Sequence, residues 1–158
     1  MKHKKFSYKS LEELKKDMEL LNLNFPIDDD ISVLREEVKE GDKVIPNRFV
    51  IHPMEGADAN SDGTPGELTL RRYRRYAEGG AGLIWFEAVA VNESGRGNEL
   101  QLYLNENTVD AFKDMVDMVR QKAKEAMGED FSPYLVIQLT HAGRVGEKRN
   151  ILFHHELV

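Results

Sequence analysis

The sequence predicts an α/β fold built around a parallel sheet. Three stretches, residues 47–54, 81–91 and 133–144, each contain a short continuous apolar run, which is typical of strands covered on both faces. Helical patterns fill the intervals between them, at residues 64–78 and 107–127. Strands that alternate with helices favour right-handed βαβ units, which a doubly wound sheet and a (β/α)8 barrel both contain.

The composition is that of an ordinary globular domain, with 158 residues, 41% hydrophobic and 32% charged. The net charge of −6 disfavours a nucleic-acid groove, because phosphate binding needs a basic surface. The absence of cysteine excludes disulfides and thiolate metal sites. The basic residues 1–5 are followed by no apolar run, and no stretch could span a bilayer. We therefore expect a cytoplasmic protein with no membrane and no nucleic acid as partner.

The N-terminal residues 1–40 are expected to form an extension with one helix. Ser10 and Glu13 have the spacing of a capping box, and apolar residues at helical spacing follow over residues 11–22. The acidic run at 28–30 indicates a solvated turn, because consecutive carboxylates do not share a face that could hold a metal.

A hairpin or extended lead-in is expected over residues 31–46, where Gly41 and Asp42 separate two short β-like runs. In the helix that follows the first strand, Thr64 is the predicted N-cap, with Pro65 at the first helical position. The arginines at 71, 72, 74 and 75 are interpreted as a solvated outer face with ion pairs rather than as a phosphate site.

Glu87 is the one acid in the otherwise apolar run 81–91. A buried carboxylate costs several kcal/mol unless it is paired or hydrogen-bonded, so its presence requires a specific partner. The helix at 107–127 carries the clearest apolar stripe, and its methionines are interpreted as core residues rather than a binding face.

Polar residues gather where each expected strand ends, at 52–55, 87–88 and 138–144. Parallel strands point their carboxyl ends to one edge, and in a barrel that edge is the active-site face. No Gly-x-Gly-x-x-Gly follows the first strand, which lowers the dinucleotide-fold alternative.

Three motifs at these ends resemble the N-terminal part of the old yellow enzyme family, in the branch of NADH:flavin oxidoreductases and 2,4-dienoyl-CoA reductases. They are NRFVIHPM at 47–54, GGAGLIWFEA at 79–88 with GR at 95–96, and QLTHAGR at 138–144. The resemblance implies a partial TIM (β/α)8 barrel, with about the first three β-strands and two helices preceded by an N-terminal helix. Residues 41–158 would then be the N-terminal part of an FMN-binding barrel.

The resemblance also implies a function, in which NAD(P)H reduces FMN and the flavin passes hydride to an activated alkene. It implies five cofactor-binding residues: Pro53, Met54 and Ala88 through backbone contacts, Glu55 near the flavin carbonyl edge, and Gln138 at the pyrimidine side. Glu55 departs from the threonine or cysteine of many relatives, and an ionised carboxylate there would disfavour negative charge on the reduced flavin. His141 and Arg144 are expected either to order the loop near the site or to anchor it as buried residues.

The length sets this chain apart from a whole enzyme of that family, because a complete barrel needs about 250 residues and eight strands. The family's substrate-binding His-x-x-His or His-x-x-Asn pair, its tyrosine proton donor and the late phosphate loops have no counterpart here. We therefore expect a fragment that is inactive in isolation, with no catalytic residue of its own. Adjacent His154 and His155 are not expected to bind a metal.

Two alternatives stay open on the sequence alone. The chain could be a non-catalytic barrel fragment that acts through an exposed sheet edge, by self-association or with a complementing chain. It could also belong to a different phosphate-binding barrel enzyme.

Overall fold

The computed structural model of the chain describes residues 5–146, so His154 and His155 lie outside the described residues. Contacts between Cα atoms divide the chain into two units, Met1–Ile31 and Ser32–Val158. The predicted division at residue 40 stays a prediction. Within the described part of the chain, no helix has both the length and the apolar character needed to cross a membrane.

The first unit contains helix α1, Leu11–Leu20, as the sequence predicts. The Ser10 hydroxyl accepts a hydrogen bond from the Glu13 N–H at 3.3 Å, which is the N-cap half of the capping box. The Glu13 carboxylate accepts from the N–H of Lys9 at 3.0 Å, one residue earlier than that motif requires. The helix ends before Asn22, whose φ of 52° lies in the left-handed region.

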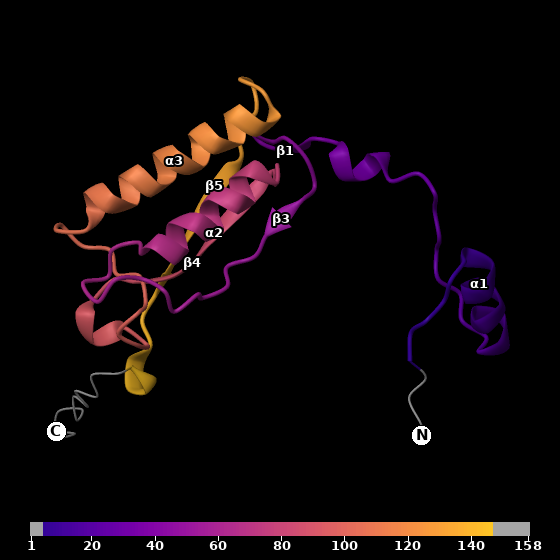
Figure 1. The fold of residues 1–158 in the computed structure, drawn as a ribbon, viewed down its shortest axis with the longest axis horizontal. Helices are drawn as coiled ribbons and strands as arrows, with labels where there is room; N and C mark the ends of the chain where they lie inside the picture. The colour runs from indigo at the N-terminus through magenta and orange to yellow at the C-terminus, as the bar shows by residue number, and fades with distance from the viewer. Residues whose placement is uncertain (1–4, 147–158) are drawn as a thin grey trace. The chain divides into compact units, whose positions relative to one another are not determined.

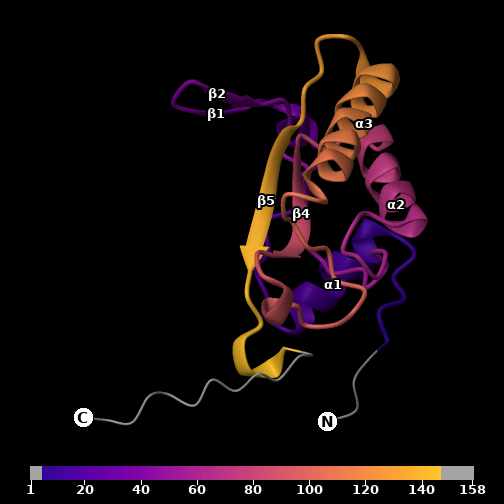
Figure 2. The ribbon, with the colours of Figure 1, turned by 90° about the vertical axis from the view of Figure 1, so that its left-hand side faces the viewer.

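The second unit is organised around a three-stranded parallel sheet in the order β3-β4-β5 (Figures 1 and 2). The strands are β3 (Val50–Ile51), β4 (Leu83–Ala90) and β5 (Tyr134–Thr140). Helix α2 (Glu67–Glu78) connects β3 to β4, and α3 (Val109–Met127) connects β4 to β5. Figure 2 shows both helices on the same side of the sheet. The predicted α/β alternation and parallel sheet are confirmed, without closure into a barrel.

A separate hairpin precedes the sheet, as the glycine between two β-like runs predicts. Strands β1 (Val38–Glu40) and β2 (Lys43–Ile45) pair antiparallel, and Gly41 in the turn has a φ of +56°. The ammonium of Lys43 lies 5.3 Å from the ring centroid of Tyr134, the first residue of β5. The hairpin therefore contacts the end of the sheet opposite to the strand carboxyl ends.

The start of α2 differs from the sequence prediction. Its N-cap is Gly66, which has no side chain to cap the helix, rather than Thr64. The Thr64 hydroxyl instead donates to the Asp62 carboxylate at 2.7 Å, within the preceding loop. The loop therefore uses the polar group that the capping box would need. The predicted end of the helix at Gly79 is confirmed.

The core lies between the helices and one face of the sheet. Its largest members are the fully buried side chains of Tyr73, Ile84, Leu102, Met115, Val89 and Val119. The expectation that the strands are covered on both faces is wrong in this structure. Trp85 alternates with the buried Ile84 and therefore faces away from the helices, where its side chain is exposed.

We expect Val119→Ala to lower the free energy of unfolding by about 2 kcal/mol, through lost burial and a residual cavity. Val119 is 0% exposed in the core face of α3. Val109→Ala on the same helix is the matched control, because Val109 is 48% exposed. That control should change stability by less than about 0.5 kcal/mol. Urea unfolding of both variants measures the difference, and equal effects would contradict this assignment of the core.

Candidate functional site

The carboxyl ends of the three strands meet at one edge of the sheet. Ala88 of β4 is in register with Gln138 of β5, and Ala90 with Thr140. An irregularity between Phe86 and Ala88 shifts the pairing register at this point. The structure therefore brings together the ends that the sequence predicts to be neighbours.

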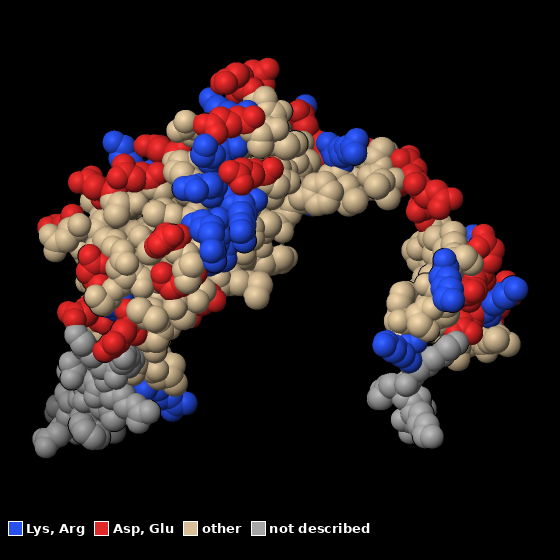
Figure 3. Space-filling model, in the orientation of Figure 1, with Lys and Arg blue, Asp and Glu red and all other residues tan. Residues whose placement is uncertain are grey.

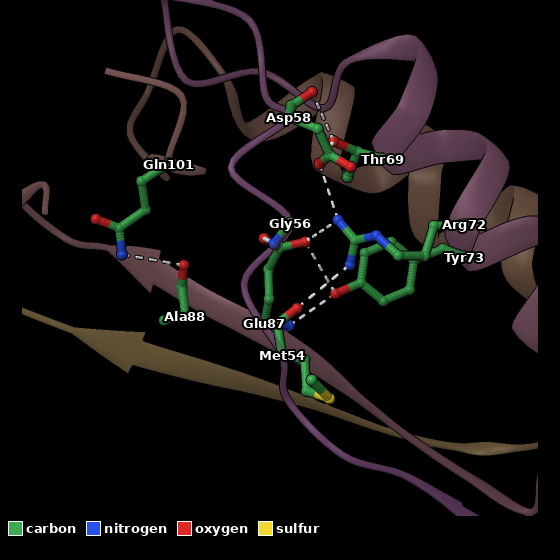
Figure 4. Close-up of polar contacts among 9 residues, drawn as sticks. All are labelled: Met54, Gly56, Asp58, Thr69, Arg72, Tyr73, Glu87, Ala88 and Gln101. Carbon is green, nitrogen blue, oxygen red and sulfur yellow. Dashed lines mark hydrogen bonds and ion pairs between the residues drawn. The ribbon is translucent and has the colours of Figure 1, made fainter. Parts of the chain in front are cut away.

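The side chain of Gln101 contacts the loop after β3 and the carboxyl ends of β4 and β5. This residue was not identified from the sequence. Its Nε2 lies 3.2 Å from the Ala88 carbonyl oxygen, 3.3 Å from Glu55 Oε1 and 3.3 Å from Thr140 Oγ1 (Figure 4 shows the Ala88 contact). Its Oε1 accepts from the Gly97 N–H at 2.6 Å, which fixes the orientation of the amide. One NH₂ group carries two hydrogens for these three acceptors, so they share its donors.

Arg96 holds the backbone of this connecting residue. Its guanidinium donates to the carbonyl of Gln101 at 3.0 Å and to that of Ser61 at 2.9 Å. The Gly95-Arg96 motif therefore orders the loop that presents Gln101. A single glutamine in a loop has no periodic pattern that would identify it as a site residue. Only the closeness of Gln101 to the Gly95-Arg96 motif could have pointed to its role.

The sequence-predicted site residues differ in their exposure. Met54 and Glu55 are exposed, and Pro53 is half-buried. Ala88 is buried, and its carbonyl is used by Gln101. These four residues lie on the loop after β3 and near the carboxyl end of β4.

Gln138 has an amide that makes no hydrogen bond with any of the described residues. It alternates along β5 with Ile137, so it lies on the face away from Leu135, which packs against the core. The same face carries Thr140, which contacts Gln101 at the strand ends. This unengaged amide offers a donor and an acceptor side by side to a bound group.

Glu87 has the partners that its burial demands. The residue is 1% exposed. Its Oε2 accepts from the Gly56 N–H at 2.9 Å, and its Oε1 accepts from the Arg72 Nη2 at 2.7 Å and from the Tyr73 hydroxyl at 3.3 Å (Figure 4). The Tyr73 hydroxyl in turn accepts from the backbone N–H of Glu87 at 2.7 Å. The carboxylate is thus paired and fully hydrogen-bonded.

Arg72 corrects the interpretation of the α2 arginines as a solvated face. Its guanidinium is half-buried and forms ion pairs with Glu87 at 2.7 Å and Asp58 at 2.8 Å. Burial by itself lowers the pKa of Arg72, but the hydrogen bonds and charges of Glu87 and then Asp58 outweigh it and raise the pKa. Burial raises the pKa of the Tyr73 phenol, and the charge of Glu87 raises it further, so the hydroxyl stays protonated at neutral pH.

The other three arginines of α2 are exposed, and within residues 5–146 they form no ion pair. Figure 3 shows the blue cluster that Lys and Arg side chains make over α2. The predicted outer face is confirmed for Arg71, Arg74 and Arg75, but the predicted ion pairs are not found there.

His141 and Arg144 are both exposed, so the buried-anchor alternative is wrong for both. The Nδ1 atom of His141 accepts a hydrogen bond from the Gly143 N–H at 3.0 Å. Its ring lies so close to Gly95 that a Cβ there would sit 2.6 Å from Cδ2. His141 therefore orders the loop after β5 against the Gly95-Arg96 segment.

Comparison with known proteins finds a family match over most of the chain. Residues 36–153 match the NADH:flavin oxidoreductase / NADH oxidase family. The NADPH dehydrogenase of Listeria welshimeri is 37% identical over 116 residues, which cover 72% of this chain and 32% of the relative. The NADPH dehydrogenase of Listeria monocytogenes serotype 4b has the same identity and coverage. The matched region thus spans about a third of the length of these relatives.

Solved structures agree with the sequence match. A mutant of morphinone reductase in complex with tetrahydroNAD is 26% identical, with a TM-score of 0.59, and the match covers 72% of this chain and 28% of that chain. Old Yellow Enzyme from Pichia sp. AKU4542 has a TM-score of 0.60 at 23% identity, with the same coverage, and shows likeness of fold. The second unit therefore has the fold of the N-terminal part of these barrels.

We expect Gln101→Leu to lower the free energy of unfolding by about 1–3 kcal/mol, because it leaves the Ala88 carbonyl and the Gly97 N–H without partners. Gln121→Leu is the matched control, since Gln121 is exposed on α3 and bonds only Glu125 among the described residues. That control should shift stability by less than about 0.5 kcal/mol. Urea unfolding gives both values, and an unchanged Gln101→Leu variant would contradict the linking role.

Proposed function

Because this chain belongs to the NADH:flavin oxidoreductase / NADH oxidase family, we propose that it supplies the first part of an FMN-dependent oxidoreductase. In the proposed reaction, NAD(P)H reduces FMN, and the flavin passes hydride to an activated alkene of a small-molecule substrate. The observation that carries the proposal is the unengaged amide of Gln138 on the same strand-end edge as Ala88 and the loop after β3.

The proposed binding roles follow from this placement. Gln138 bonds the pyrimidine side of the flavin, where its amide offers both a donor and an acceptor. Pro53, Met54 and Ala88 contact the ring through their backbone. Such contacts would orient the ring at the strand ends.

Glu55 is proposed to tune the flavin. Its carboxylate shares the Gln101 amide and is otherwise exposed at the rim. A negative charge near the ring disfavours negative charge on the reduced flavin, so Glu55 should lower the reduction potential or favour protonation of the reduced ring.

The choice of reductant is supported by the relatives. Two are NADPH dehydrogenases, and one solved neighbour holds tetrahydroNAD. Since the matched region covers 32% of the first relative, the residues that act on substrate and those that bind the FMN phosphate are proposed to lie outside this chain. We propose a cytoplasmic location for the assembled enzyme, with neither nucleic acid nor membrane as partner.

A second candidate function is an interaction module that acts through the β5 edge. Ile137 and Leu139 on this strand are 41% and 57% exposed. Beside them lies a groove of about 380 Å³, lined mainly by apolar residues of α3 and β5. An open apolar edge of this kind favours pairing with another chain.

The flavin proposal is tested by joining this chain to the part of the Listeria welshimeri NADPH dehydrogenase outside the matched region. The joined protein should bind FMN and show flavin absorbance, whereas the chain alone should stay nearly colourless. Gln138→Leu should weaken FMN binding by about fivefold, since one hydrogen bond contributes about 1 kcal/mol. Gln121→Leu is the control and should bind normally. A joined protein without flavin, or equal affinities for both variants, would contradict the proposal.

The interaction module is tested by light scattering. We expect the chain to associate at micromolar concentration and Leu139→Lys to make it monomeric, because charge on an edge strand opposes pairing. Leu68→Lys, at an exposed leucine of α2, is the control and should still associate. A strictly monomeric parent chain would exclude this candidate.

A further inference from the structure

The loop of residues 53–58, here called the site loop, is held by two charged residues from different elements. We propose that Arg72 of α2 and Glu87 of β4 are positioning residues that set the conformation in which the site loop receives the flavin ring. This inference rests on the proposed function, because Pro53, Met54 and Glu55 belong to that loop.

Arg72 contacts the site loop at two places. Its Nη2 donates to Asp58 Oδ1 at 2.8 Å while it also bonds Glu87, and its Nη1 lies 3.4 Å from the Met54 carbonyl oxygen. The Thr69 hydroxyl of α2 donates to the same Asp58 oxygen at 2.6 Å. One guanidinium thus connects both ends of the site loop to the sheet, and its planar fork suits this arrangement.

Glu87 holds the middle of the site loop through the Gly56 N–H, at 2.9 Å. Gly56 has no room for a side chain, because a Cβ there would lie 2.1 Å from Arg72 Nη2. The backbone at Gly56 therefore fits directly against the ion pair (Figure 4).

The backbone of the site loop is strained between these contacts. Ala57 has a φ of 47°, in the left-handed region that side chains with a Cβ rarely adopt. Such a conformation persists where surrounding contacts enforce it, and it tends to occur at functional sites. Gly56 and Asp58, the residues on either side, are the ones that Glu87 and Arg72 hold.

The network should act on geometry more than on global stability. Replacing a buried ion pair with apolar residues of similar size is often neutral, whereas removing one partner leaves a buried charge unpaired. A variant that removes both Arg72 and Glu87 leaves neither of these two charges unpaired, and Asp58 keeps its hydrogen bond from the Thr69 hydroxyl at 2.6 Å. The chain offers this variant as Arg72→Met with Glu87→Leu.

The first test is amide hydrogen exchange on the full 158-residue chain. In the double variant, the Gly56 amide should exchange at least about tenfold faster, while Ile84 and Val119 in the core keep their protection. Arg75→Met is the matched control, because Arg75 is an exposed arginine of α2 without an ion pair among the described residues. Unchanged exchange at Gly56, or equal acceleration in the control, would overturn the proposal.

The second test measures FMN binding to the protein that joins this chain to the rest of the Listeria welshimeri NADPH dehydrogenase, by chemical-shift changes at Ala88 and Gln138. The double variant of the joined protein should bind FMN about tenfold more weakly than its parent. The single variant Arg72→Lys should lose less affinity than the double variant, because a lysine pairs with one carboxylate but cannot bridge two. A double variant of the joined protein that binds FMN as tightly as its parent would overturn the positioning role. A parent joined protein with no shifts would count against the proposed function, and the exchange result would then decide the role of the pair.

Discussion

A carboxylate buried in a sheet needs a cation and hydrogen-bond donors beside it. The groups that pair with Glu87 hold the segments of the candidate site together. Its ion pair with Arg72 joins β4 to α2, and its bond to the Gly56 N–H joins both to the loop after β3. Low dielectric makes such a network costly when it is incomplete, so all its members are constrained together. The path of the loop is therefore set by the charge balance of the strand beside it.

Gln101 makes the corresponding link at the rim. Its amide reaches the loop after β3, the end of β4 and the end of β5, while Arg96 holds its backbone. The two networks, one buried and one at the edge, fix three strand ends that belong to separate parts of the sequence. Rigid support of this kind is what a binding surface for a planar ring requires.

The sequence was sufficient for the parallel α/β order, the hairpin at Gly41 and the convergence of the strand ends, because apolar periodicity and strand direction carry that information. The sequence indicated that Glu87 needs a polar partner, but it did not identify Arg72 as that partner. Arg72 lies among three solvated arginines of the same helix, and only the packing of α2 on the sheet distinguishes it. Gln101 and the Gly66 cap were missed because tertiary contacts, rather than local patterns, decide them.

The measurement that bears most directly on the convergence of the three strand ends is the set of nuclear Overhauser contacts from the Gln101 side-chain amide. Contacts to Ala88, Thr140 and Glu55 together are the result we expect, since all three acceptors lie within 3.3 Å of Nε2. An amide that shows contacts to only one of these residues, or to none, would mean that the ends do not form a common rim. The flavin site derived from that rim would then have to be abandoned.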